Sequence, residues 1–95
     1  MNFQLCFLEK LDVLLHPYSS SFVKSKRVSY DNLEVTTYYW KETKLIIDVI
    51  GDECCLTATD NNIIYVFYDD DWEEVLGDVF NDIYSITNPS VSPKN

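Results

Sequence analysis

The sequence predicts an α+β domain of two layers, in which a four-stranded antiparallel β-meander is flanked by an N-terminal and a C-terminal helix. Two turn signals, Gly51-Asp52 and Asp60-Asn61, separate runs rich in β-branched and aromatic residues. These residue types tolerate the positive φ that two-residue hairpin turns require. After the last run, apolar residues recur at spacings of three and four, which is typical of an amphipathic helix. A fifth strand at residues 22–30 is an open alternative.

The first helix is expected at residues 3–16, with Asn2 as its N-cap. Pro17 ends the helix, because proline cannot donate the next backbone hydrogen bond and restrains the residue before it. One side of the helix is apolar and consists of Phe7, Leu8, Leu11, Leu14 and Leu15. His16, the only histidine, lies in the last turn, where a partial positive charge suits the helix dipole. It has no companion that would mark it as a catalytic base.

A loop at residues 18–21 and the segment 22–30 follow. The segment carries Lys24, Lys26 and Arg27, and charged side chains on an edge strand discourage pairing with other chains. The alternatives are that this basic patch faces the acidic helix or a second copy of the chain. A turn at Asp31-Asn32 then leads into the sheet.

The strand at residues 33–40 connects to the next strand in one of two ways. A two-residue turn at 41–42 gives a core face of Glu34, Thr36 and Tyr38. A three-residue loop at 41–43 gives a core face of Leu33, Val35, Thr37 and Tyr39. We expect the second, because it buries apolar groups instead of a carboxylate.

The next three strands are expected at residues 43–50, 53–59 and 62–68. Two-residue turns pair Ile50 with Glu53 and Thr59 with Asn62. Side chains alternate between the two faces of a sheet, so both turns set the same face toward the core. That face carries nine apolar residues: Leu45, Ile47, Val49, Cys54, Leu56, Ala58, Ile63, Tyr65 and Phe67.

The opposite face of the sheet is expected to be too apolar to be an ordinary solvated surface. Its apolar residues are Tyr38, Trp40, Ile46, Ile50, Ile64, Val66 and Tyr68, and its polar residues are Lys44, Asp48, Glu53 and Thr57. Either a helix or a partner protein covers it.

The second helix is expected at residues 71–86, with Asp71 as N-cap and Glu74 completing a capping box. Its apolar stripe consists of Trp72, Val75, Leu76, Val79, Phe80, Ile83 and Ile86. Glu74, Asp78 and Asp82 recur every four residues on the far side, and each such like-charge pair costs about 0.2–0.5 kcal/mol in an isolated helix. Helix stability alone does not favour this arrangement.

Residues 1–86 are expected to form a single domain, and residues 87–95, which hold two prolines, a flexible tail. No apolar run approaches transmembrane length, and the N-terminus lacks the pattern of a signal peptide. The sequence therefore favours a soluble cytoplasmic protein.

The negative charge lies in the second half of the chain. Residues 1–50 hold six basic and six acidic residues, whereas residues 51–95 hold one basic and ten acidic residues, so the formal net charge of -9 arises entirely there. Such asymmetry indicates a directed electrostatic field. The negative charge also argues against direct binding to nucleic acid, and no membrane partner is expected.

The sequence offers little to catalysis. Three cysteines, Cys6, Cys54 and Cys55, are an odd number without metal-ligand spacing, and they favour a reducing compartment. The three consecutive aspartates at 69–71 lack the alternating ligands and glycine of a calcium loop, and no glycine-rich phosphate loop is present. We therefore predict no catalytic, metal-binding or cofactor-binding residues, and no enzyme activity.

The sequence therefore favours a function in recognition, with a basic protein as the partner. The spaced carboxylates of an acidic ridge would replace phosphates in a basic groove; the ridge consists of Asp69, Asp70, Asp71, Glu73, Glu74, Asp78 and Asp82. Aromatic anchors usually dominate binding energy at protein interfaces, and the second sheet face offers Tyr38, Trp40 and Tyr68. The apolar second face also makes a homodimer an alternative.

In its size, its acidity, its sheet-plus-helix layout and its acidic ridge, the chain resembles small acidic bacterial or phage proteins that neutralise enzymes acting on nucleic acid. This class includes immunity proteins of contact-dependent growth inhibition, nuclease antitoxins and anti-CRISPR proteins. The resemblance implies a non-enzymatic inhibitor of a toxin nuclease. The alternatives are a phage anti-defence inhibitor that mimics DNA and a homodimeric structural or assembly protein.

Overall fold

The computed structural model describes residues 3–59, 61–68 and 70–87. Its elements are α1 (Phe3–Leu15), the 3-10 helix η1 (His16–Ser21), β1 (Phe22–Val28), β2 (Glu34–Trp40), β3 (Leu45–Ile50), β4 (Glu53–Thr57), β5 (Asn62–Val66) and α2 (Trp72–Thr87). The strands form one antiparallel sheet in the order β1-β2-β3-β4-β5. The predicted α+β class is confirmed, and the segment at 22–30 supplies the fifth strand.

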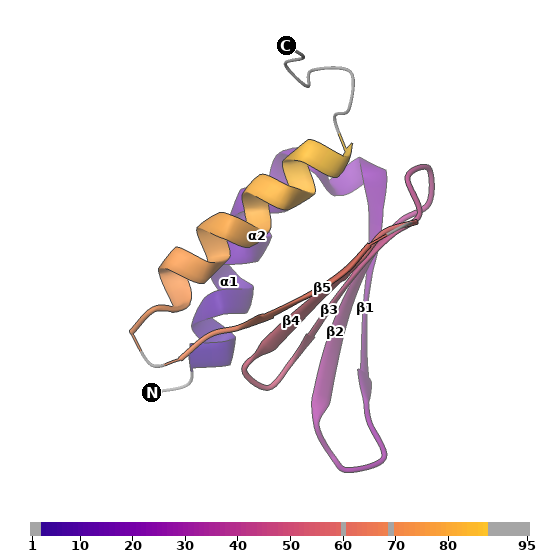
Figure 1. Ribbon diagram of the computed structural model, residues 1–95. Coiled ribbons are helices and arrows are strands. Elements are labelled where there is room, and N and C mark those ends of the chain that lie inside the picture. Colours follow the sequence, from indigo (N-terminus) through magenta and orange to yellow (C-terminus); the bar gives the residue numbers. More distant parts are fainter. Residues whose placement is uncertain (1–2, 60, 69, 88–95) are drawn as a thin grey trace.

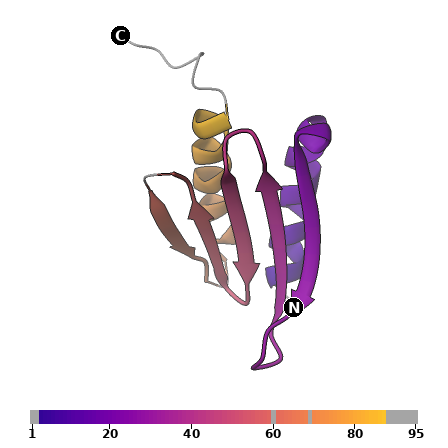
Figure 2. The ribbon, with the colours of Figure 1, turned by 90° about the vertical axis from the view of Figure 1, so that its right-hand side faces the viewer.

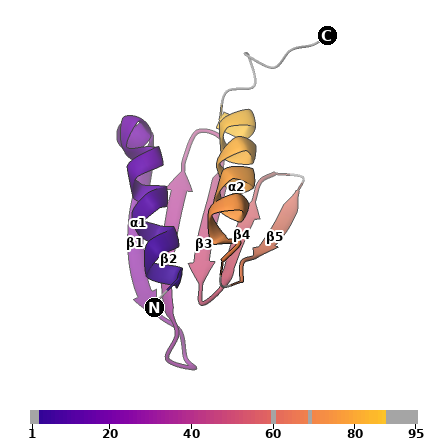
Figure 3. The same ribbon diagram turned by 90° about the vertical axis from the view of Figure 1, so that its left-hand side faces the viewer.

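Both helices lie on the same face of the sheet, which gives one helical layer and one sheet layer (Figure 1). Helix α1 lies over the β1–β2 end of the sheet, and α2 lies over the β3–β4 part (Figure 3). Among the described residues, no helix lies on the other face (Figure 2). Neither helix in the described part of the chain is long and apolar enough to cross a membrane.

The core fills the space between the two helices and the sheet. Phe7 of α1 stacks on Phe67 with ring centroids 4.3 Å apart. The helices contribute apolar stripes, and the sheet contributes the face that was expected from its central turns. The fully or nearly fully buried members are Phe7, Leu8, Leu11, Leu15, Tyr38, Trp40, Leu45, Ile47, Val49, Cys54, Leu56, Phe67, Leu76, Val79 and Ile83.

The prediction of which face of β2 points toward the core is wrong. The loop between β2 and β3 has four residues, so Trp40 pairs with Leu45 and Tyr38 with Ile47. Lys44 closes this loop in the left-handed region with a φ of 57°. A four-residue loop sets the same face inward as the rejected two-residue turn. That turn was rejected because it would bury the carboxylate of Glu34. The carboxylate is not buried, because Glu34 lies at the exposed start of the strand.

The register of β5 also differs from the expected one. The turn at Gly51-Asp52 pairs Ile50 with Glu53 as predicted, and Gly51 has a φ of 56°. The next loop is longer than predicted, because Ala58 N–H donates to Asn61 O at 2.8 Å. Asn62 therefore pairs with Thr57 instead of Thr59. A shift of two residues keeps every side chain on its expected face.

The ends of the helices lie close to their expected positions. Helix α1 ends at Leu15, one residue before the prediction, and the expected loop at 18–21 is part of η1. Helix α2 begins at Trp72 and extends to Thr87. The predicted cap Asn2 and the rest of the expected tail, 88–95, lie outside the described residues.

Candidate partner-binding surface

The turn between β5 and α2 is held by Asp71. Its carboxylate accepts a hydrogen bond from Tyr68 N–H at 2.5 Å, and its carbonyl accepts the first helical bond from Val75 N–H at 3.0 Å. Asp71 therefore occupies the expected N-cap position, but its side chain bonds backward to the turn. This contact places Tyr68 beside the first acidic residues of the helix.

Helix α2 turns its acidic residues outward because its apolar stripe faces the core. Leu76, Val79 and Ile83 are buried, whereas Asp70, Glu73, Glu74 and Asp78 are exposed. We define the acidic surface as Asp70, Asp71, Glu73, Glu74 and Asp78. The remaining aspartate of the run, Asp69, lies outside the described residues.

Asp82 does not belong to this surface. Its Oδ2 accepts a hydrogen bond from the hydroxyl of Tyr65 on β5, and its side chain is half-buried. Each four-residue step along a helix rotates the side chain by about 40°, so two steps from Glu74 bring position 82 toward the sheet. The sequence placed Asp82 on the far side, and the structure assigns it to the contact between helix and sheet.

The meander converts the charge asymmetry of the sequence into an asymmetry in space. Strands that follow one another in the chain are neighbours in the sheet, so β1 and β5 lie at its opposite edges. The basic residues lie on α1, on β1 and in the loop between β2 and β3: Lys10, Lys24, Lys26, Arg27, Lys41 and Lys44. Helix α2 contacts β5 at the other edge. It also packs against α1, and Lys10 of α1 lines a pocket together with Trp72 of α2. The basic strand therefore does not face the acidic helix.

Few ion pairs offset these charges. The only salt bridge among the described residues joins Lys24 Nζ to Asp12 Oδ2 at 2.8 Å, and both residues belong to the β1–α1 end. Within the part of the chain that the structure describes, no salt bridge joins the acidic surface to a basic side chain. An external cation or a basic partner would reduce the electrostatic repulsion between its carboxylates.

The expected aromatic anchors separate into two groups. Tyr38 and Trp40 are 0% and 4% exposed and pack under the helices, so their placement on the second sheet face is wrong. The four-residue loop described above is the cause. Tyr68, in contrast, is 66% exposed and borders the acidic surface. Three further aromatic residues are exposed: Tyr30 after β1, Tyr39 on the sheet, which was expected on the core face, and Tyr84 on α2.

The thiols are not arranged as nucleophiles. Burial raises the pKa of Cys54 to about 12, with smaller contributions from Cys55 and Asp48. Burial also raises the pKa of Cys55, together with Glu53 and Asp48. Both thiols therefore stay protonated near neutral pH, and a thiol is a weak nucleophile. Within the described residues, no group of three or more histidine, cysteine or carboxylate side chains is placed to hold a metal ion.

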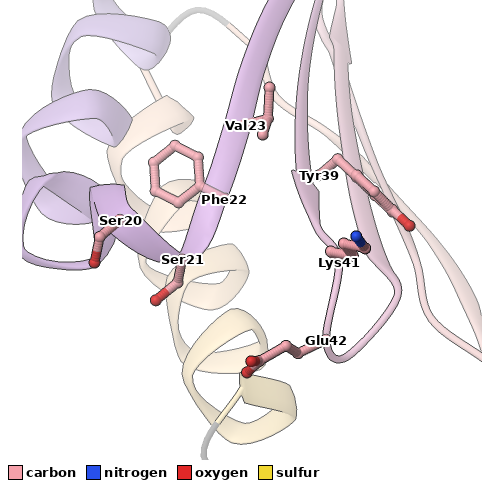
Figure 4. Close-up of a pocket in the computed structure, with 7 residues that line it drawn as sticks. All are labelled: Ser20, Ser21, Phe22, Val23, Tyr39, Lys41 and Glu42. Atoms are coloured by element: carbon pink, nitrogen blue, oxygen red, sulfur yellow. The ribbon is translucent and has the colours of Figure 1, made fainter.

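An open cavity of about 310 Å³ lies between the start of β1 and the end of β2 (Figure 4). It is lined by Ser20, Ser21, Phe22, Val23, Tyr39, Lys41 and Glu42. Lys41 and Glu42 give it one charge of each sign. Both residues belong to the loop that leads into β3, so this cavity is separate from the acidic residues at the start of α2.

Comparison of the chain with protein-family models, with curated proteins and with solved structures found no match.

Proposed function

We propose that this chain is a non-enzymatic, cytoplasmic inhibitor that binds a basic enzyme acting on nucleic acid and blocks it, in the manner of an immunity protein or antitoxin. The observation that carries the proposal is the acidic surface at the start of α2, where five carboxylates form no salt bridge with a basic side chain among the described residues. Enzymes that bind nucleic acid present basic grooves to phosphate groups. Carboxylates along one helix face complement such a groove.

The energetics of the helix support a role in binding. Acidic side chains in the first turn are favoured by the helix dipole, which accounts for Glu73 and Glu74. Asp78 lies beyond the first turn, and its repulsion from Glu74 costs about 0.2–0.5 kcal/mol. A basic groove removes this cost on binding. Complementary charge also raises the association rate, and both effects weaken as salt increases.

Tyr68 gives this surface an apolar contact. Its exposed ring lies where β5 ends and α2 begins, and the bond from its N–H to Asp71 fixes the backbone there. Tyrosine combines a large contact area with low conformational entropy, and it is enriched among residues that dominate binding energy. We assign Tyr68 as the aromatic anchor of the acidic surface, in place of Tyr38 and Trp40.

The experiment is a capture from lysate of the source cell at low and at high salt, followed by mass spectrometry and an activity assay. The expected result is one basic enzyme that is retained at low salt, and whose cleavage or binding of nucleic acid is inhibited at a one-to-one ratio. Capture of no such enzyme, or of an enzyme whose activity is unaffected, would contradict the proposal. The source of the enzyme separates a toxin partner from a host defence nuclease, which a phage inhibitor would target.

A further inference from the structure

The sheet face that carries no helix has a regular pattern of side chains (Figure 2). The pairings of the five strands place these residues in three rows that cross the sheet. From β1 to β5, the first row is Val23, Tyr39, Ile46, Thr57 and Asn62. The second row is Ser25, Thr37, Asp48, Cys55 and Ile64, and the third is Arg27, Val35, Ile50, Glu53 and Val66.

Much of this face is apolar and open to solvent. Val23 and Ile64 are more than half exposed, and Tyr39 and Val66 are more than a third exposed. Ile46 and Ile50 are half-buried between them. Exposed apolar side chains on a sheet, here on either side of a more polar middle row, are typical of an interface.

The third row carries two opposite charges at a fixed separation. Arg27 on β1 and Glu53 on β4 are both exposed, and neither makes an ion pair among the described residues. They are three strands apart, which is about 14 Å at the usual spacing of strands. The two side chains do not form a salt bridge with each other in the structure.

We propose that this face packs against the same face of a second copy of the chain. A two-fold axis parallel to the strands, between β2 and β3, places β1 of each copy over β4 of the other. Arg27 of each copy then lies over Glu53 of the other, so the pair forms twice. This reciprocity is the property that an isologous interface requires.

The same axis matches the other two rows. Tyr39 of each copy lies over Ile46 of the other, and Thr37 lies over Asp48, which already accepts a hydrogen bond from Thr37 of its own chain at 2.5 Å. An axis along β3 would instead place Asp48 over Asp48 and Arg27 over Val66. Of these two axes, only the one between β2 and β3 places opposite charges over each other, so the charges favour that register.

The dimer leaves the acidic surface free, because α2 lies in the helical layer on the other side of the sheet (Figure 1). The inference is thus independent of the proposed function, and the two can fail separately. If both hold, the dimer presents two acidic surfaces that point away from each other.

The test is sedimentation equilibrium over a dilution series of the wild-type chain and of two charge reversals, Arg27→Glu and Glu53→Arg. The wild type is expected to be a dimer, and each reversal alone to raise the dimer dissociation constant roughly tenfold or more, because both pairs become repulsive. An equimolar mixture of the two variants is expected to form a heterodimer, since each repulsive pair is then replaced by an attractive one. The double variant is expected to dimerise like the wild type.

Matched controls reverse a charge on the helix side of the same strands or their neighbours. Lys26→Glu lies next to Arg27 but points to the other face, and Glu34→Arg does the same for an acidic position on β2. Neither is expected to change the dissociation constant. A wild-type chain that is monomeric throughout would overturn the proposal. So would a dimer that tolerates either single reversal, or single variants that fail to combine with each other.

Discussion

The phenol of Tyr38 on β2 donates a hydrogen bond of 2.6 Å to Asp12 Oδ1 on α1. The other oxygen of Asp12 pairs with Lys24 on β1 at 2.8 Å, and Lys24 Nζ lies 5.7 Å from the centre of the Tyr38 ring. One carboxylate thus ties the first helix to the first two strands. Tyr38, which the sequence suggested as a binding residue, is a structural residue.

Replacing Tyr38 with Phe is expected to destabilise the fold by about 1.5–3 kcal/mol, because a hydrogen bond to a charged group is lost while the ring is kept. Replacing Lys24 with Met is expected to cost only about 0–1 kcal/mol, since the ion pair is partly exposed. Urea denaturation measures both free energies of unfolding. A Tyr38→Phe variant as stable as the wild type would contradict this account of the α1 contact.

Alkaline pH is expected to destabilise the fold. Burial, and then Asp12, raise the pKa of Tyr38 above its ordinary value of 10.0, and burial raises the pKa of Cys54 from 9.0 to about 12. Both groups keep their protons in the folded state when the unfolded chain has lost them. Their stabilising contribution is therefore complete below the unfolded pKa and is lost as the pH rises above it.

The slope of the free energy of unfolding against pH shows which groups are responsible. Above about pH 9 the free energy of unfolding is expected to fall, by at most about 1.4 kcal/mol per pH unit for each group. Cys54→Ala is less stable overall because it leaves a cavity, but its stability is expected to fall less steeply between about pH 9 and pH 12. Equal slopes for the variant and the wild type would rule out Cys54 as a source. Urea titrations at a series of pH values provide the comparison.

Two adjacent threonines on β2 are expected to respond in opposite ways to the same substitution. Thr36 is 1% exposed, and its hydroxyl has no hydrogen-bond partner among the described residues. Thr36→Val keeps the shape and removes a buried unpaired polar group, so it is expected to stabilise the fold by about 1–2 kcal/mol.

Thr37 faces the other side of the sheet, and its hydroxyl donates to Asp48 at 2.5 Å. Thr37→Val is therefore expected to destabilise the fold by about 1 kcal/mol or more. Thermal or urea unfolding of the two variants tests which face of β2 is buried. If the signs were reversed, the four-residue loop and the register of β2 would both be wrong.

The acidic residues of α2 are expected to differ from one another in their effect on stability. Asp82→Asn weakens the hydrogen bond from Tyr65 and is expected to cost about 1 kcal/mol. Glu74→Gln and Asp78→Asn relieve a like-charge pair, and each is expected to be neutral or to stabilise by about 0.2–0.5 kcal/mol. Helical circular dichroism during thermal unfolding would distinguish the two classes. Equal destabilisation by all three would contradict the separation of Asp82 from the acidic surface.

The sequence was sufficient for the elements and for most of the core, because alternation and helical spacing depend only on neighbouring residues. The prediction from the sequence failed where it depended on the length of a loop. Lys44 adopts a positive φ of 57° although lysine seldom does, and nothing local in 41–44 indicates that choice. That single residue reversed the face of β2 and moved Tyr38 and Trp40 from the expected binding surface into the core.

The sequence predicted the acidic character of the candidate site but not which residues belong to it. Glu74 and Asp78 were placed on the exposed side correctly, because the apolar stripe of α2 determines which side faces the core. Asp82 was misplaced because its role depends on Tyr65, a residue of another element that only the packed fold brings near. Charge segregation was evident in the sequence, but its separation in space follows from the meander order.

Calorimetry at several salt concentrations can determine the affinity of the captured enzyme for a variant in which Glu73→Gln, Glu74→Gln and Asp78→Asn are combined, and this affinity decides whether the acidic surface binds the partner. Asp82 is kept, because its loss would affect the fold. The matched control, Asp31→Asn with Glu34→Gln and Glu42→Gln, removes three exposed carboxylates from β2 and the loops on either side of it. We predict that the first variant binds at least tenfold more weakly at low salt with a flatter salt dependence, while the control binds like the wild type. Equal affinities for the two variants, with both folded, would contradict the claim that the acidic surface binds the partner.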